Sequence, residues 1–290
     1  MVVCESQGHE YSLVEHLARS IYFGDDWAQL KMVMLSAYFD RSEYTEDHAT
    51  LVVAGYISEV EAWKSFDSEW KHFLALPEYS VPYFHMKEFT VSRGVFSNGW
   101  KGQHRKRREF LEGLIRIVQR HTFASFATGV RLDEFNAVLQ EFPDIHPQCP
   151  IRSPFAYCGW LCVRKAEDHA LRERFSNPRV QSYFEKGDKD RHFLEDILDH
   201  FKHPTPQFKP KIPEYPEQEA DCLRPLQCAD FAAWEVVKYS RSVDANPNMD
   251  WDDVRESFKQ LNKYPPAYWG LVEPDAIRDH VQSMLTYQCA

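Results

Sequence analysis

Residues 32–57 read MVMLSAYFDRSEYTEDHATLVVAGYI, and this stretch is the clearest indicator of the fold class. The first eight residues, 32–39, are apolar on both faces, which is typical of a strand buried inside a sheet that is covered on both sides. This apolar run ends abruptly at Asp40. After a polar turn over 40–48, residues 49–57 form a second apolar run rich in β-branched side chains. The stretch therefore predicts two adjacent strands that pair as a hairpin.

The rest of the chain alternates between helical and strand patterns. Amphipathic helices are expected over 59–76, 108–120, 155–175, 192–201, 226–239, 251–261 and 273–285, and strands over 81–86, 123–132 and 179–185. A hairpin followed by alternating helices and strands predicts an α/β protein with a mixed sheet flanked by helices. We divide the chain into an N-terminal extension (1–31), a central domain (32–242) and a C-terminal helical extension (243–290) packed on the same domain.

The composition is that of a globular protein. Hydrophobic residues make up 43% of the 290 residues and charged residues 27%, which is close to the average for soluble domains. No apolar run approaches the ~18 residues of a membrane-spanning helix, and no basic region followed by an apolar stretch marks an export signal. We therefore expect a cytoplasmic protein without a membrane partner.

Seven cysteines are scattered along the chain in apolar or helical surroundings. Their odd number and irregular spacing favour reduced core thiols in a cytoplasmic protein. Thirteen histidines are also present, but no CxxC or HxxxH pair occurs, so structural zinc is not expected.

The net charge of −10 argues against a protein that holds nucleic acid through its overall electrostatics, because such binding neutralises phosphates. Any contact with nucleic acid then requires a local basic patch. The best candidate is a basic cluster at a predicted helix start, although such a run is usually a solvated face. It consists of Lys101, His104, Arg105, Lys106, Arg107 and Arg108. An acidic balance also agrees with a metal-dependent nuclease, whose carboxylates are neutralised by the metal.

Two carboxylates stand at the ends of predicted strands. Asp40 ends the central strand, where open α/β sheets place ligand sites, although an aspartate that only starts a turn fits equally well. Glu185 ends the strand 179–185 on the face shared with Gln181 and Tyr183, although taken alone it also fits a surface glutamate before a turn. If the two strands are parallel neighbours, the carboxylates lie about 5 Å apart. One divalent ion could then bridge them.

Asp230 lies in the middle of an apolar helix stripe that runs from Leu226 to Val237. Burying an ionised carboxylate costs several kcal/mol unless it is paired or coordinates a metal, so Asp230 requires a partner. A buried arginine that pairs with Asp230 is the competing interpretation. Glu235 falls on the opposite face of the same helix, where we expect it to be solvated and without a special role.

Six short motifs occur in a fixed order between about Ala37 and Tyr239. They are AYFD, LVVAGYIS, a helix with W…F…EW, FHM, YFEKGD and LQCADFAAWE. Each motif is weak alone, but in this order they resemble the DUF 3800 domain family. That family is bacterial and is grouped with ribonuclease H-like folds.

The resemblance implies a ribonuclease H-like fold with a metal site. Carried over residue by residue, the acidic positions of the family fall on Asp40, Glu185 and Asp230, with His85 and Asp188 as neighbours in the site. Three carboxylates supply the oxygen ligands that Mg²⁺ or Mn²⁺ prefers. We therefore expect the three to converge within roughly 8 Å of one another.

One position departs from the family pattern. Members often read Asp-Glu-Ser-Gly where this chain has Asp-Arg-Ser-Glu over residues 40–43, so the second carboxylate is missing from its usual place. Glu43 and Glu88 are the candidates to replace it. His85 could donate to a phosphate or orient a water, although a single histidine beside an apolar run is more often a hydrogen-bonded core residue.

The combined expectation is a bacterial enzyme that hydrolyses phosphodiester bonds of DNA or RNA with Mg²⁺ or Mn²⁺. In this mechanism Asp40 and Asp230 hold the ion or ion pair, Glu185 completes the shell, and the metal activates a water. A second ion, if present, stabilises the leaving oxygen. The residues expected to contact phosphates are Arg105, Lys106 and Arg108. Two other functions stay open. One is a ribonuclease H-like binding or assembly subunit without catalysis, for instance in a bacterial defence or toxin system, and the other is a small-molecule phosphohydrolase, which has no use for the basic cluster.

Overall fold

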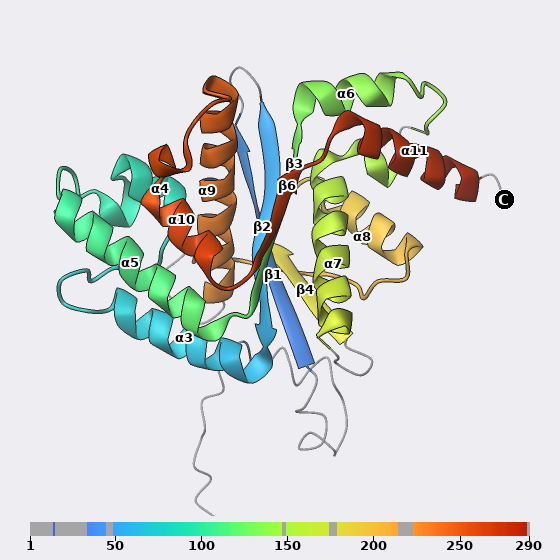
Figure 1. Ribbon diagram of the computed structural model, residues 1–290. Helices are drawn as coiled ribbons and strands as arrows, with labels where there is room; N and C mark the ends of the chain where they lie inside the picture. The colour runs from blue at the N-terminus through green and yellow to red at the C-terminus, as the bar shows by residue number, and fades with distance from the viewer. Residues whose placement is uncertain are drawn as a thin grey trace, which may run out of the picture.

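The computed structural model describes residue 14 and residues 34–44, 49–146, 149–173, 179–213 and 223–288. The expected N-terminal extension lies outside the described residues, apart from Val14. In the described part, a mixed six-stranded sheet carries helices on both faces, so the expected α/β class is confirmed (Figure 1). No helix of the described residues is long and apolar enough to cross a membrane.

The sheet has the strand order β5-β4-β1-β2-β3-β6. Its strands are β1 (Met34–Tyr44), β2 (Thr50–Glu59), β3 (Ala124–Arg131), β4 (Arg179–Glu185), β5 (Gln207–Lys209) and β6 (Ala267–Leu271). Strands β1 and β2 pair antiparallel, which confirms the expected hairpin, and β2 pairs antiparallel with β3. The other neighbours, β1 with β4, β4 with β5 and β3 with β6, are parallel. The strand β1 therefore lies inside the sheet, as its apolar sequence predicts.

Helices form a layer on each face of this sheet (Figure 1). One layer contains α3 (Val60–Leu74), α4 (Met86–Val91), α5 (His104–His121), α9 (Arg224–Ala245) and α10 (Glu256–Lys263). The other contains α6 (Leu132–Gln140), α7 (Pro154–Arg172), α8 (Arg191–His200) and α11 (Pro274–Gln288). Short 3₁₀ turns lie at Gly94–Phe96, Pro150–Arg152 and Trp251–Asp253.

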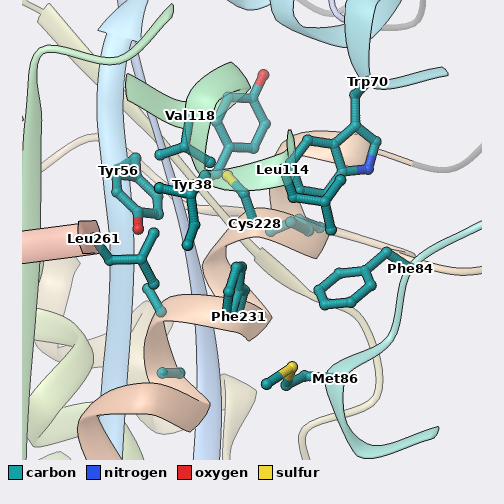
Figure 2. Packing of buried hydrophobic residues seen from close by; sticks show 14 of the residues in the cluster. Tyr38, Tyr56, Trp70, Phe84, Met86, Leu114, Val118, Cys228, Phe231 and Leu261 are labelled. Atoms are coloured by element: carbon teal, nitrogen blue, oxygen red, sulfur yellow. The ribbon is translucent and has the colours of Figure 1, made fainter. Parts of the chain in front are cut away.

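Each face of the sheet contributes to its own apolar core. Along β1, Tyr38 packs into the core on the α9 side and the next residue, Phe39, into the core on the α7 side. This alternation explains why the strand is apolar on both faces. Figure 2 shows the core on the α9 side, where Phe84 and Met86 lie beside Phe231 of α9. Burying each large apolar side chain of this kind stabilises the fold by about 1.5–3 kcal/mol.

The described cysteines agree with the expected reduced core thiols. Cys149, Cys158, Cys162 and Cys228 are buried and form no disulfide. Burial raises the pKa of the Cys158 and Cys228 thiols, so both stay protonated and unreactive. The other three cysteines lie outside the described residues.

The segment 81–86 is not a strand, which corrects the sequence prediction. Two of its backbone N–H groups donate to side chains of α9: that of Phe84 to Gln227 and that of Met86 to Asp230. A strand requires those groups for a neighbouring strand. Consequently His85 does not end a strand but precedes the short helix α4.

The C-terminal segment is not purely helical, which is a second correction. The helix α9 continues to Ala245, past the expected boundary at 242. Residues 267–271, where no strand is expected from the sequence, form β6 at one edge of the sheet. Trp269 of β6 packs against Tyr239 of α9 and Phe258 of α10, and this aromatic contact holds the strand in place. The C-terminal segment therefore completes the sheet of the central domain.

Candidate acidic site

Strand pairing places Asp40 and Glu185 on one face of the sheet. The parallel register of β1 and β4 pairs Tyr38 with Tyr183, and their rings stack with centroids 4.7 Å apart. Asp40 and Glu185 each follow two residues later, so they point to the same side as the two tyrosines, toward α9. The expected parallel neighbourhood of the two strands is confirmed.

The strand β1 extends further than expected. It continues to Tyr44, because Arg41 to Tyr44 still pair with β2, whereas pairing with β4 ends at Phe39. Asp40 therefore does not end the strand but lies where the parallel neighbour ends. This position leaves its side chain beside the end of β4 and not in a turn.

The third carboxylate comes from the helix that covers this face. Asp230 lies in α9, is 6% exposed, and accepts a 2.7 Å hydrogen bond at Oδ2 from the backbone N–H of Met86. This bond orients the other oxygen, Oδ1, away from α4. The apolar stripe predicted around Asp230 is present, since Leu226, Ala233 and Val237 are buried in the core on the α9 side.

All three carboxylates converge on one cation, the ammonium group of Lys211. Its Nζ lies 2.6 Å from Oδ2 of Asp40, 3.1 Å from Oε2 of Glu185 and 3.1 Å from Oδ1 of Asp230. Three oxygens this close to one nitrogen are also close to one another. The expected convergence of the carboxylates is confirmed, although residues 40 and 230 are far apart in the chain.

Sequence reasoning missed Lys211. It lies in a proline-rich segment, in the sequence KPKIP, two residues after Lys209 of β5. The register pairs Lys209 with Glu185, so a strand-like continuation places Lys211 on the same face as Lys209. That alternation was the available signal. It went unused because the expected partner of Asp230 was an arginine or a metal.

The backbone of Lys211 is held by α9. Its carbonyl oxygen accepts a 2.8 Å hydrogen bond from Nε2 of Gln227, which is 1% exposed. Oε1 of the same glutamine accepts from the indole N–H of Trp70 at 2.9 Å and from the backbone N–H of Phe84 at 3.0 Å. Gln227 thus fixes both Lys211 and the segment before α4 relative to α9.

Burial and excess negative charge set the protonation of the cluster. The side chains of Asp40 and Lys211 are 2% and 6% exposed, whereas that of Glu185 is 34% exposed. Burial raises the pKa of Asp40 well above its ordinary value, and Glu185 and Asp230 raise it further against the opposing effect of Lys211. Burial opposes the charge of Lys211, but the three carboxylates outweigh burial and raise its pKa, so Lys211 remains an ammonium ion.

A pocket of about 310 Å³ opens beside the cluster. Its polar lining is Asp40, Arg41, Glu185, Lys186, Asp188 and Lys189. Asp188, expected as a site neighbour, lines the same pocket as Asp40 and Glu185. Lys186 and Lys189 are exposed cations that sequence reasoning did not select, although both lie in the turn KGDKD directly after Glu185. The rest of the lining includes Phe39, Phe155 and Phe184 of the core on the α7 side, and the positive charge of the pocket could contact an anion.

Arg41 replaces the second carboxylate of the family pattern and reverses the charge there. Its Nη1 donates to Oδ2 of Asp188 at 2.8 Å, and its backbone N–H donates to Oδ1 of Asp40 at 2.8 Å. The guanidinium also lies 6.0 Å from the ring centre of Phe155. Of the two candidate replacements, the side chain of Glu43 lies outside the described residues.

Glu88, the other candidate, takes part in a small polar group with His85. Nδ1 of His85 lies 3.4 Å from Oε1 of Glu88, and the hydroxyl of Tyr83 lies 3.2 Å from Oε2. Burial, together with the charge of Glu88, raises the pKa of Tyr83 to about 12, so this hydroxyl stays a donor. His85 directly precedes Met86, whose backbone N–H donates to Asp230.

The basic cluster lies at the start of α5 and does not line the pocket beside Asp40. Arg105 pairs with Glu109 at 2.7 Å, and Lys106 lies 4.2 Å from the ring centre of Trp100. Arg108 lies 3.9 Å from Glu112. These three side chains are surface residues with local partners, so the solvated-face interpretation remains open beside the phosphate-binding one.

The expectation for Glu235 is wrong. This side chain is 1% exposed and accepts hydrogen bonds from Arg255 at 3.1 Å and from Ser257 at 2.7 Å. α10 packs against α9, and Arg255 and Ser257 at its start hold Glu235, so this side of the helix is covered and not solvated. Glu235 is the acid of a structural ion pair that attaches the C-terminal segment to α9.

Three carboxylates are donors of the kind that divalent ions prefer, but in this structure they surround the ammonium group of Lys211. Among the described residues, no three His, Cys, Asp or Glu side chains stand ready to hold a metal ion. The carboxylate oxygens surround Nζ of Lys211 at 2.6–3.1 Å, whereas Mg²⁺ requires oxygens at about 2.0–2.1 Å. Three converging carboxylates that already hold one cation nevertheless supply the oxygen chemistry of a Mg²⁺ or Mn²⁺ site.

No protein-family model, curated protein or solved structure matches this chain.

Proposed function

We propose that the protein is a divalent-metal-dependent nuclease of the ribonuclease H-like kind. The observation that carries this proposal is the convergence of Asp40, Glu185 and Asp230 on one buried cation beside a pocket of about 310 Å³. Carboxylates gathered around a cation are the usual protein contribution to metal-assisted phosphodiester hydrolysis.

The strand order also supports the ribonuclease H-like proposal. Three meandering antiparallel strands, β3-β2-β1, are followed on the far side of β1 by the parallel strands β4 and β5. A mixed sheet flanked by helices is what the resemblance to ribonuclease H-like folds implies. The carboxylates lie on β1, on β4 and on the helix that follows β5, which are the positions that the resemblance to the DUF 3800 family implies. A bacterial origin belongs to the same proposal.

The proposed ligands of Mg²⁺ or Mn²⁺ are Asp40, Glu185 and Asp230. A bound ion would supply positive charge and lower the pKa of a coordinated water. The chain supplies the rest: the backbone N–H groups of Arg41 and Met86 fix the orientation of Asp40 and Asp230. The more exposed Glu185 faces the pocket in which the scissile phosphate would lie.

The proposed substrate is DNA or RNA, held by local positive charge. With a net charge of −10, the protein needs such patches to attract phosphates. Lys186 and Lys189 line the pocket, and on α5 Arg105 and Arg108 lie exposed and Lys106 half-buried. We assign the first pair to the scissile phosphate and the second group to phosphates further along the strand. The buried thiols support a reducing compartment, the cytoplasm.

The test is a cleavage assay with Mn²⁺ or Mg²⁺ over labelled single- and double-stranded DNA and RNA. We expect metal-dependent cleavage that falls by at least about 100-fold in Asp40→Asn and Asp230→Asn. Asp196→Asn, which changes an exposed aspartate of α8, is the matched control and should retain activity. Cleavage that survives Asp40→Asn would show that the activity comes from elsewhere.

A second candidate function has its own supporting observation. Lys211 already neutralises part of the acidic cluster, as in a structural ion network. This favours a ribonuclease H-like binding or assembly subunit without catalysis. Thermal unfolding separates the two functions, because Mn²⁺ should raise the melting temperature of a nuclease and leave that of the subunit unchanged.

A further inference from the structure

We propose that Lys211 is a built-in competitor of the divalent ion, whose ammonium group must leave the three carboxylates before the ion can bind them together. This inference rests on the proposed function, since it concerns the same carboxylates. It adds a regulatory property: the site stays closed by an internal cation until the concentration of divalent metal is high enough to displace it.

The oxygens of the cluster leave one shared position for a cation. In Asp40, Oδ1 accepts the backbone N–H of Arg41 and Oδ2 faces Lys211. In Asp230, Oδ2 accepts the backbone N–H of Met86 and Oδ1 faces Lys211. The oxygens that face the centre are thus the ones that Lys211 holds. A divalent ion that takes these oxygens takes the position of Nζ.

The charges of the cluster also support competition between Lys211 and the divalent ion. When all three carboxylates are ionised, they and the one ammonium group leave an excess of two negative charges, so the cluster attracts a further cation. A divalent ion within about 3 Å of the ammonium group would be repelled by it, because both are positively charged. The repulsion is strong because the site is shielded from water. Binding of the ion together with departure of the lysine removes that repulsion. Lys211 therefore raises the metal concentration at which the site fills.

The movement can be confined to the side chain. The backbone is held at the carbonyl of Lys211 by Gln227 and at the carbonyl of Pro210 by the N–H of Leu223. A lysine carries its charge on a flexible four-carbon stem. The pocket of about 310 Å³ is lined by Glu185, which is already a partner of Lys211, and by Asp188. This pocket offers space for the displaced ammonium group.

The direct test measures the reactivity of Lys211 in the unmodified protein. Brief treatment with acetic anhydride, read by mass spectrometry, labels amines that solvent reaches. We expect Lys211 to be protected in EDTA and its labelling to rise at least about tenfold with saturating Mn²⁺. Lys189, which is exposed, and Lys165, which donates to Thr128, are the matched controls and should label equally in both conditions. Bound Mn²⁺ with Lys211 still protected would overturn the inference.

A second experiment removes the ammonium group of Lys211 by substitution. Titration calorimetry with Mn²⁺ should give at least about tenfold tighter binding to Lys211→Gln than to the parent, whereas Lys186→Gln, at the rim of the same pocket, should change affinity by less than about twofold. Equal Mn²⁺ affinity of parent and Lys211→Gln, or no binding to either, would overturn the inference.

The outcomes separate this inference from the proposed function. Tight Mn²⁺ binding by Lys211→Gln without cleavage of any nucleic acid would refute the nuclease and leave the competition standing. Metal-dependent cleavage by a parent whose Mn²⁺ affinity equals that of Lys211→Gln would refute the competition and leave the nuclease standing.

Discussion

The Nζ atom of Lys211 lies 2.6 Å from Oδ2 of Asp40, and both side chains are buried. The contact joins the central strand β1 to the segment that follows the edge strand β5, across β4. Because Glu185 and Asp230 contact the same nitrogen, this ion pair is the centre of a four-residue network. The stability of the metal-free protein should therefore depend on it.

Replacing Lys211 with methionine, which keeps most of the stem and removes the charge, leaves three converging carboxylates without a cation. Breaking a buried ion pair in this way costs about 3–5 kcal/mol, so we expect a loss of that size in the free energy of unfolding at neutral pH in EDTA. Urea unfolding measures it. Lys186→Met, which changes an exposed lysine nearby, is the control and should cost less than about 0.5 kcal/mol. An unchanged stability of Lys211→Met would mean that the network contributes nothing to folding.

The protonation of Asp40 predicts a pH dependence of stability. Its pKa in the folded protein is raised by burial and by its acidic neighbours, so the folded state binds this proton more tightly than the unfolded state. The resulting stability is fully present below the ordinary aspartyl pKa and is lost as the pH rises through the raised value. Relative to Asp40→Asn, the parent in EDTA should lose stability over that window, at up to about 1.4 kcal/mol per pH unit.

Urea unfolding of parent and Asp40→Asn at a series of pH values checks this window, with the exposed Asp196→Asn as a control that should track the parent throughout. A stability difference between parent and Asp40→Asn that is independent of pH would show that Lys211 keeps Asp40 ionised.

Gln227 connects the acidic cluster to the core, and its loss should be costly. Gln227→Ala leaves three buried groups without their partner: the carbonyl of Lys211, the indole N–H of Trp70 and the backbone N–H of Phe84. Each unsatisfied buried group costs about 1–3 kcal/mol, so a loss of at least about 3 kcal/mol is expected in urea unfolding. Gln260→Ala, which removes a contact with the exposed Glu256, should change stability by less than about 0.5 kcal/mol. Similar losses in the two variants would contradict this role of Gln227.

The basic cluster on α5 separates into binding and structural residues. Replacing Arg105, Lys106 and Arg108 together with glutamine should weaken nucleic-acid binding and flatten its salt dependence, with a nearly unchanged melting temperature. Arg107→Gln is the opposite case, because Arg107 donates to the carbonyl of Phe89 at 2.7 Å and lies 4.0 Å from the centre of its ring. This variant should lower the free energy of unfolding by about 1–2 kcal/mol. Fluorescence anisotropy at several salt concentrations measures binding, and thermal unfolding measures stability. Nucleic-acid binding that is unchanged in the triple variant would mean that Arg105, Lys106 and Arg108 are only a solvated face.

Local periodicity was sufficient for most of the architecture. The apolar runs over 32–39 and 49–57 predicted the central hairpin, and the stripe around Asp230 predicted a carboxylate on the inner face of a helix. These predictions are reliable because a strand or a helix repeats its side-chain direction every few residues, so burial of one face is visible in the sequence. The segment 81–86 misled the same reasoning, since its apolar residues are buried without being in a strand.

Within the acidic site, the sequence by itself determined which carboxylates face inward, since the face occupied by Asp40, Glu185 and Asp230 follows from alternation along β1 and β4 and from the turn of α9. The tertiary structure alone decided that their shared partner is Lys211 and that Glu235 pairs with Arg255. The physical reason is that a charge buried by one element can be neutralised by any oppositely charged side chain that packing brings near. Distance along the chain does not limit that choice, and only the assembled sheet and helices fix it.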